Sequence, residues 1–184
     1  MKSLIILITI FYVNYLYALP SEVFIMRHAE KEKGSNTLSA KGYQRANAYV
    51  QFFTNSNFTK TYGIPDVIFA ARPKDDDSSI RSIETVTPLA HKLNLKLRTE
   101  YIRAEFDLLA LLILKNSELS HKKILISWPH NRIVDIALKL GVEESGLVWS
   151  DKVFDRVWVL KYSDDQLESF EDLPEKLLPG DSEI

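Results

Sequence analysis

The chain has 184 residues, of which 46% are hydrophobic and 26% are charged, and its formal net charge is -2 at neutral pH. This length suits one globular domain, and the nearly balanced charge gives no electrostatic reason to expect a nucleic-acid partner. The sequence has no cysteine, which excludes disulfides, thiolate metal sites and a cysteine nucleophile.

Residues 1–18 have the layout of a secretory signal peptide. Lys2 supplies the positive end, residues 4–13 are almost entirely apolar, and the small residue Ala18 marks a cleavage point. The pattern predicts a secreted or periplasmic protein whose domain, residues 21–184, keeps no stable association with a membrane. The alternative is an uncleaved anchor, although the apolar run is shorter than the ~20 residues that span a bilayer.

The first strand is expected at residues 23–26, which lead directly into Arg27-His28. A short apolar run with polar residues after it is typical of a buried strand in a parallel sheet. Ser39 is a candidate N-cap for a helix with one apolar face, and residues 54–62 are expected to form a loop. A second strand follows at residues 66–70, before an acidic run that indicates a solvated loop.

The second half of the chain continues to alternate strands with helices. A helix is expected from Ser79, in which Pro88 indicates a kink or a break. The next elements are a short strand at 93–97, a leucine-rich helix at 104–114, a strand at 123–127, a helix at 133–140, a strand at 153–162 and an edge strand at 167–170. This order predicts a three-layer α/β/α sandwich with a mostly parallel central sheet.

Two of the apolar strands run into a histidine, one at Arg27-His28 and the other at His130, and a helix begins near Arg81 after a third strand. In α/β sheets, ligands bind beyond the carboxyl ends of the strands. Cationic groups gathered there repel one another unless an anion lies between them. A guanidinium binds two phosphoryl oxygens, and a histidine can attack phosphorus or donate a proton, so this set indicates phosphoryl chemistry.

Four spaced motifs occur in order along the chain. They are Arg27-His28-Ala29-Glu30, Leu38-Ser39-x-x-Gly42-x-x-Arg45-Ala46, Ser78-x-x-Arg81-x-x-Glu84-Thr85, and His130 after a strand. With these motifs the sequence resembles the histidine phosphatase superfamily, also called the phosphoglycerate mutase-like family, over almost everything after residue 20. The resemblance implies the phosphoglycerate mutase-like fold.

The resemblance also implies the roles of the site residues. In that family the first histidine is phosphorylated during turnover, and two arginines and the second histidine bind the phosphate. Carried over, His28 is the nucleophile, and Arg27, Arg81 and His130 bind the phosphoryl group. Neither a cofactor nor a metal is expected, because the chain shows no clustered Asp and His set that looks like a metal site.

The sequence departs from the family pattern in ways that affect the proton donor. Ala29 replaces the usual glycine, and Asn131 follows His130 where the acid phosphatase and phytase branch has an acidic donor. An amide cannot donate a proton as an acid, so that branch's mechanism does not transfer. The best candidates are Glu105, which we favour, and Asp107, since many relatives place a glutamate acid in this segment. The alternative is that these carboxylates only stabilise a first helical turn.

The remaining candidates are weaker. Arg72, after the second strand, is a possible phosphate contact. We expect His91 and His121 at the surface, and Trp128 and Trp158 in the core.

The sequence therefore favours an exported phosphomonoesterase that hydrolyses a small-molecule phosphate ester through a phosphohistidine on His28. A mutase is less favoured, because no additional basic cluster is visible that would hold a second phosphorylated substrate. The alternative from a different class is a catalytically silent domain on the same fold that binds an anion or a partner. The missing His-Asp pair favours that alternative, and the retention of both histidines and both arginines favours the enzyme.

Overall fold

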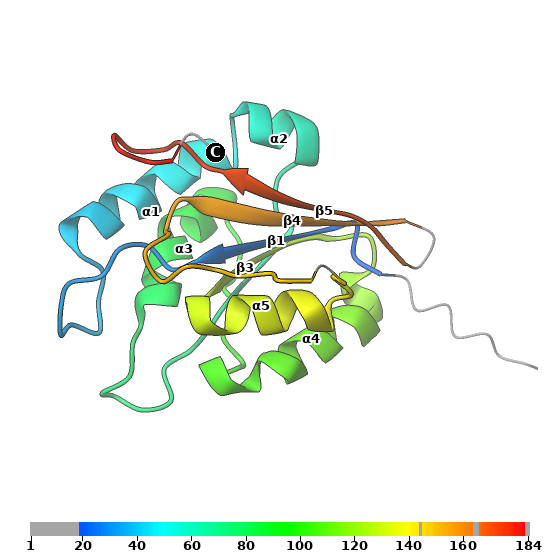
Figure 1. Cartoon of the computed structure of the whole chain (residues 1–184), viewed down its shortest axis with the longest axis horizontal. Coiled ribbons are helices and arrows are strands. Elements are labelled where there is room, and N and C mark those ends of the chain that lie inside the picture. The colour runs from blue at the N-terminus through cyan, green and yellow to red at the C-terminus, as the bar shows by residue number, and fades with distance from the viewer. Residues whose placement is uncertain (1–18, 144, 164–165, 183–184) are drawn as a thin grey trace, which may run out of the picture.

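The computed structural model describes residues 19–143, 145–163 and 166–182, and within them the strands form a single mixed sheet (Figure 1). The strands are β1 (Glu22–Arg27), β2 (Val67–Ala70), β3 (Lys123–Trp128), β4 (Arg156–Ser163) and β5 (Gln166–Pro174), in the spatial order β2-β3-β1-β4-β5. Strands β1, β2 and β3 are parallel, β4 is antiparallel to β1, and β5 is antiparallel to β4. Among the described strands only β4 therefore runs against the rest, which confirms the mostly parallel sheet expected from the sequence.

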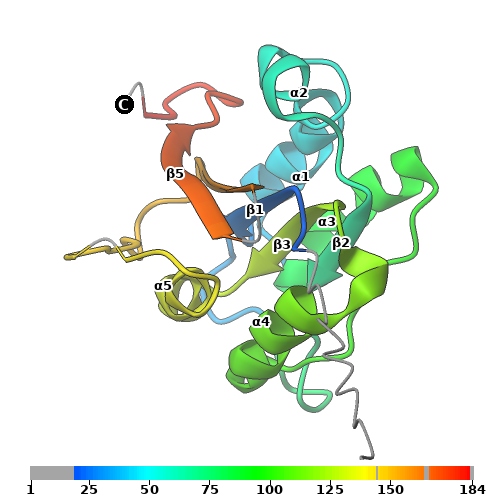
Figure 2. The same cartoon turned by 90° about the vertical axis from the view of Figure 1, so that its right-hand side faces the viewer.

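The helices cover both faces of this sheet. They are α1 (Ala40–Phe52), α2 (Asn57–Tyr62), α3 (Arg81–Leu93), α4 (Phe106–Lys115) and α5 (His130–Lys139), with short 3-10 turns at Arg103–Glu105 and Ser117–Leu119. Helices α1, α2 and α3 lie on one face, and α4 and α5 lie on the other, as Figure 2 shows along the sheet edge. The three-layer α/β/α architecture is confirmed.

The alternation of side chains along β1 explains the two cores. Val23 and Ile25 pack with residues of α4 and α5, while Phe24 and Met26 pack with residues of α1 and α3. All four side chains are fully buried. A strand that is buried on both faces must be apolar throughout, and this is why β1 reads as a continuous apolar run in the sequence.

The structure differs from the sequence prediction at three elements. The strand expected at 93–97 is absent, because α3 continues to Leu93 and ends at Asn94 in the left-handed conformation. The segment that follows pairs with β2 through an isolated bridge at Arg98. The loop expected at 54–62 contains α2, which a capping box at Ser56 stabilises. Helix α5 begins at His130 and so places this histidine in its first turn.

The predicted signal peptide, residues 1–18, lies outside the described residues. In the part of the chain that the structure describes, no helix is long and apolar enough to cross a bilayer. Helix α3 runs through Pro88 without ending there, so the proline does not break it.

Candidate active site

The site forms where β1 and β3 end side by side. These strands pair in register, with Arg27 opposite Trp128, and the amide of His28 donates to the carbonyl of Trp128 at 3.2 Å. After each of these strands the polypeptide leaves the sheet at the same edge, so His28 and His130 follow the ends of neighbouring strands. The charge of His130 lowers the pKa of His28, which is consistent with this closeness.

His28 is held as a neutral imidazole. Its side chain is buried, and Nδ1 lies 2.8 Å from the carbonyl oxygen of Ala29. Burial, the largest cause, and the positive charges of Arg81 and Arg27 together lower the pKa of His28 from 6.5 to about 3. A carbonyl only accepts hydrogen bonds, so Nδ1 carries the proton and Nε2 keeps a free lone pair. That lone pair is what a nucleophile requires.

Arg27 is enclosed by the segment that precedes β4. One terminal guanidinium nitrogen, Nη1, donates to the carbonyls of Asp151 at 2.6 Å and Val153 at 3.1 Å. The centre of the guanidinium lies 3.7 Å from the centroid of the Phe154 ring, a cation–π contact, and that ring also lies 6.2 Å from the ring of His28. Burial lowers the pKa of Arg27 to about 10, and the charge of Arg81 adds to this effect. At neutral pH Arg27 therefore remains a cation.

Arg81 stands in the first turn of α3, which follows the loop after β2. Its Nε donates to the hydroxyl of Ser79 at 2.6 Å. The hydroxyl of Thr85 donates to the carbonyl of Arg81 at 2.8 Å and accepts from the amide of Ala29 at 2.9 Å. Thr85 thus links the residue after His28 to the helix that carries Arg81, and this fixes His28 relative to Arg81.

His130 is less buried than His28 and lies in the first turn of α5. Burial lowers its pKa below the ordinary value, and the charge of Arg27 lowers it further. The positive end of a helix also disfavours a cationic histidine at its N-terminus. His130 is therefore neutral at neutral pH and can donate one ring N–H to an oxyanion.

The two acid candidates lie on either side of the start of α4. Glu105 ends the 3-10 turn, and its Oε2 accepts from the amide of Ile102 at 2.9 Å. Asp107 is exposed in the first turn of α4. The two residues before Glu105, Arg103 and Ala104, line the cavity described next, whereas neither carboxylate does.

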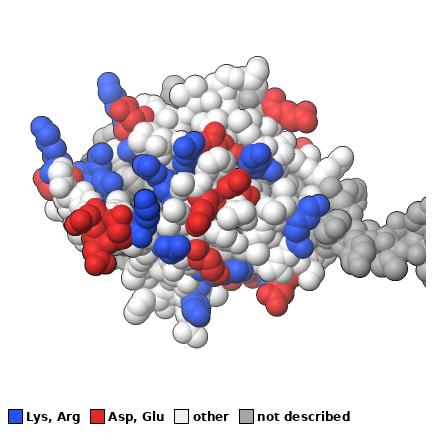
Figure 3. Space-filling model, turned by 90° about the horizontal axis from the view of Figure 1, so that it is seen from below, with Lys and Arg blue, Asp and Glu red and all other residues white. Residues whose placement is uncertain are grey.

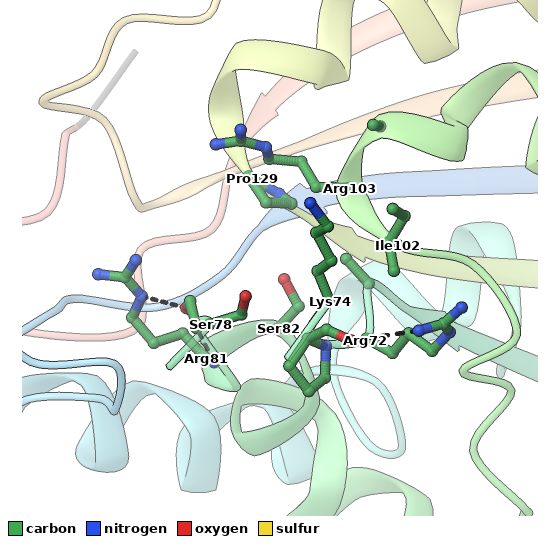
Figure 4. Close-up of a pocket in the computed structure, with 12 residues that line it drawn as sticks. Arg72, Lys74, Ser78, Arg81, Ser82, Ile102, Arg103 and Pro129 are labelled. Carbon is green, nitrogen blue, oxygen red and sulfur yellow. Dashed lines mark hydrogen bonds between the residues drawn. The ribbon is translucent and has the colours of Figure 1, made fainter. Parts of the chain in front are cut away.

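A cavity of about 280 Å³ opens beside Arg81 (Figure 4). Arg81, Ser82 and Pro129 form the side towards His28 and His130, since Pro129 directly precedes His130. The loop after β2 and the segment before α4 form the rest. Arg72, a weaker candidate from the sequence, lines this cavity, and its guanidinium donates to the carbonyls of Glu100 at 3.1 Å and Pro73 at 3.3 Å.

A network of buried charged side chains holds the loop after His28 in place through Glu30. Arg45 of α1 is 1% exposed and makes two hydrogen bonds to Glu30 at 2.7 and 2.9 Å and two to Asp181 at 2.7 and 2.8 Å. Burial raises the pKa of Asp181, but the hydrogen bonds and the charge of Arg45, together with the amides of Leu177 and Leu178, outweigh burial and lower this pKa to about 2. Tyr49 donates to Glu175 at 2.8 Å, and burial raises the pKa of this glutamate well above its ordinary value.

Helix α1 approaches this loop closely. Ser39 caps the helix by accepting from the amide of Gly42 at 3.2 Å. A β-carbon at Gly42 would overlap the carbonyl oxygen of Glu30, so only glycine fits this position. Gly42 and Arg45 therefore both fix the loop after His28, Gly42 by close packing and Arg45 by its hydrogen bonds to Glu30.

Sequence reasoning missed the segment Asp151–Phe154, which encloses Arg27. Nothing in its composition distinguishes it from an ordinary connection, and its contact with the site depends on β4 pairing with β1. Sequence reasoning also missed the carboxylates of Glu175 and Asp181. Within the described ranges, no group of three or more His, Asp and Glu residues is placed to hold a metal ion.

Among solved structures, the chain is similar to the protein histidine phosphatase SixA in complex with tungstate. The TM-score is 0.59, the sequence identity is 13%, and the match covers 84% of this chain and 97% of that chain. It is also similar to a protein of Agrobacterium tumefaciens assigned as a phosphohistidine phosphatase SixA, with a TM-score of 0.50, 18% identity, and coverage of 83% and 98%. No protein-family model matches the sequence, and no curated protein matches it. The fold expected from the motifs is confirmed: this chain has the fold of the histidine phosphatases.

Proposed function

We propose that the protein is a phosphatase that hydrolyses phosphate monoesters through a phosphohistidine on His28. The observation that carries the proposal is the state of this residue: a buried, neutral imidazole with Nδ1 bonded to a carbonyl and two arginines close by. The likeness of the fold to a histidine phosphatase that binds tungstate supports it, because tungstate is a tetrahedral oxyanion like phosphate.

The first step is an in-line displacement at phosphorus. Nε2 of His28 forms a bond to phosphorus as the bond from phosphorus to the ester oxygen breaks, and the leaving oxygen takes a proton from a general acid. Arg27 and Arg81 bind the non-bridging oxygens, whose negative charge is shared through the transition state. His130 donates a hydrogen bond to one of them. Water then attacks phosphorus and gives its proton back to the general acid as the bond from phosphorus to Nε2 breaks, which releases inorganic phosphate and neutral His28.

We assign the general acid to Glu105, with Asp107 as the alternative. Glu105 is held by the amide of Ile102 next to residues that line the cavity. If Glu105 is the acid, Glu105→Gln should slow alkyl phosphates far more than phenyl phosphates, because a phenolate leaves with little protonation. Asp107→Asn is the matched control, and a larger selective loss in that variant would move the role to Asp107.

The intermediate itself is the decisive test. The full chain is mixed with a ³²P-labelled phosphate monoester and quenched in alkali, where a phosphohistidine survives; it should then be lost in acid. His28→Asn should abolish the label, and His91→Asn, at an exposed position of α3, should keep it. Turnover without any label on His28 would refute the mechanism. Phosphate binding with neither label nor turnover, over a panel of esters and a range of pH, would favour the silent anion-binding domain.

Export of the protein is part of the same proposal, and it rests on residues 1–18 alone. In a secreting host, the mature chain should appear outside the cytoplasm with its N-terminus at residue 19. A full-length chain that stays with the membrane fraction would support the anchor instead. A full-length chain in the cytoplasm would refute export.

A further inference from the structure

The cavity beside Arg81 has a basic lining. Besides Arg81, the cationic residues that line it are Arg72, Lys74 and Arg103, while no aspartate or glutamate of the described chain does so. Figure 4 shows the side chain of Lys74 extending towards Pro129 and Arg103. The three additional cations come from two segments about thirty residues apart, which explains why the sequence showed no basic cluster.

These cations make no ion pair within the described chain, although the charge of Glu84 acts on Arg81. None of the four cations forms a salt bridge with any residue that the structure describes. Arg72 donates only to backbone carbonyls, and Arg81 donates to the hydroxyl of Ser79. Figure 3 shows that basic and acidic side chains are interspersed over the face that it draws. A concave site with one sign of charge favours a ligand of the opposite sign.

The neighbouring acidic run does not offset these cations inside the cavity. The loop after β2 carries Asp75, Asp76 and Asp77, yet none of them lines the cavity. Asp75 accepts a hydrogen bond from the hydroxyl of Ser78 at 2.6 Å, and the backbone carbonyl of Asp77 accepts one from Asn36. The aspartates are exposed, as are Lys74 and Arg103, so solvent screens both sets of charges, and the difference between them is that only the cations line the cavity.

We propose that this cavity is a second anion subsite, and that the substrate carries a second anionic group on the alcohol that leaves. The inference rests on the proposed function, because Arg81 belongs both to the phosphoryl site and to this cavity. The volume of about 280 Å³ lies at the small end of the usual range for ligand sites, so it fits a short substituent. The substrate class is a small phosphate monoester with a carboxylate or a second phosphate a few bonds from the hydrolysed group.

The test uses a pair of esters that differ in one group. The esters are 3-(phosphonooxy)propanoate and 3-hydroxypropyl phosphate, in which a neutral CH2OH replaces the carboxylate. The wild-type enzyme should prefer the carboxylated ester by about tenfold in kcat/KM, the effect expected of two partly exposed ion pairs. Propane-1,3-diyl bisphosphate then shows which second anion is favoured. Added salt should reduce the preference.

The variant that isolates the subsite is the double substitution Lys74→Gln, Arg103→Gln. It should bring the preference close to one and leave the rate with 3-hydroxypropyl phosphate within about twofold of wild type, because neither side chain is placed at the reacting phosphoryl group. The matched control is Lys92→Gln, Lys139→Gln, at two exposed positions on α3 and α5, which should retain the preference. Equal use of both esters by the wild type, or an unchanged preference in the first double variant, would overturn the subsite.

A binding measurement separates the subsite from the catalytic proposal. Calorimetry with 4-phosphonobutanoate and 4-hydroxybutylphosphonate, neither of which can be hydrolysed, should show the same charge preference in the wild type and its loss in the Lys74, Arg103 double variant. That result without turnover of any ester would keep the subsite and refute the phosphatase. Turnover of both esters with no charge preference in either assay would keep the phosphatase and refute the subsite.

Discussion

Acid should destabilise the protein through His28, and the size of the effect follows from its burial. The pKa of this histidine falls from 6.5 to about 3 in the folded protein, so the unfolded chain binds one more proton in the range between these values. Stability from the neutral side chain is therefore complete above the ordinary pKa and is lost as the pH falls towards 3. Between about pH 7.5 and about pH 5, linkage gives a loss of about 2 kcal/mol in the free energy of unfolding.

The variant that tests this is His28→Asn. An asparagine amide can donate to the carbonyl of Ala29 as Nδ1 does, but it does not titrate in this range. Its smaller volume lowers stability at every pH, so the informative quantity is the change between the two pH values. The variant should lose about 2 kcal/mol less than the wild type over the same range.

Urea titrations at both pH values, in buffers free of phosphate, measure this change. The exposed residue His91 supplies the control, because His91→Asn should retain the pH dependence of the wild type. The same loss in the wild type and in His28→Asn would show that His28 is not held neutral by the fold. The proposed role of His28 as nucleophile would then lose the neutral imidazole on which it rests.

Three further changes test the support of the site and the phosphoryl contacts. Arg45→Met should lower the free energy of unfolding by about 3–5 kcal/mol in urea titrations, because it leaves carboxylates buried without their partner. The control, Lys41→Met at an exposed position, should lower it by less than about 0.5 kcal/mol. Similar values for the two variants would show that the buried ion pairs of Arg45 are not important for stability. Gly42→Ala should cost about 1–3 kcal/mol through its clash, and a neutral result would show that the loop can move. Toward phenyl phosphate, Arg81→Ala should lose about a hundredfold in kcat/KM and Arg72→Ala far less; equal losses would mean that the wrong arginine was chosen.

The strands that carry the site could be predicted from the sequence alone. β1 and β3 are apolar on both faces because helices cover both sides, and such runs are visible without any tertiary information. Both run into a histidine, so the parallel pairing predicted from the pattern also predicts that His28 and His130 meet at one edge. Their placement depends on strand order, which alternating strands and helices largely determine.

The features that the sequence could not provide depend on contacts between distant segments. The expected strand at 93–97 has an alternating pattern, but α3 uses Leu93 in its last turn and the chain then meets β2 only at Arg98. Phe154 reaches Arg27 because β4 pairs with β1, and no local pattern marks this contact. The basic lining of the cavity likewise appears only when two separate loops are brought together.

The pairing of Arg45 with Asp181 also sets an order of events during synthesis. The two residues are 136 positions apart, and Arg45 holds the loop that follows His28. At ribosomal speeds of ~5–20 residues per second, Asp181 is added on the order of ten seconds after Arg45. During that interval Arg45 lacks this carboxylate partner, and for part of it β1 lacks its antiparallel neighbour β4. The loop after His28 should therefore reach its final conformation only after residue 181 has left the ribosomal tunnel, however early Arg27 and His28 emerge.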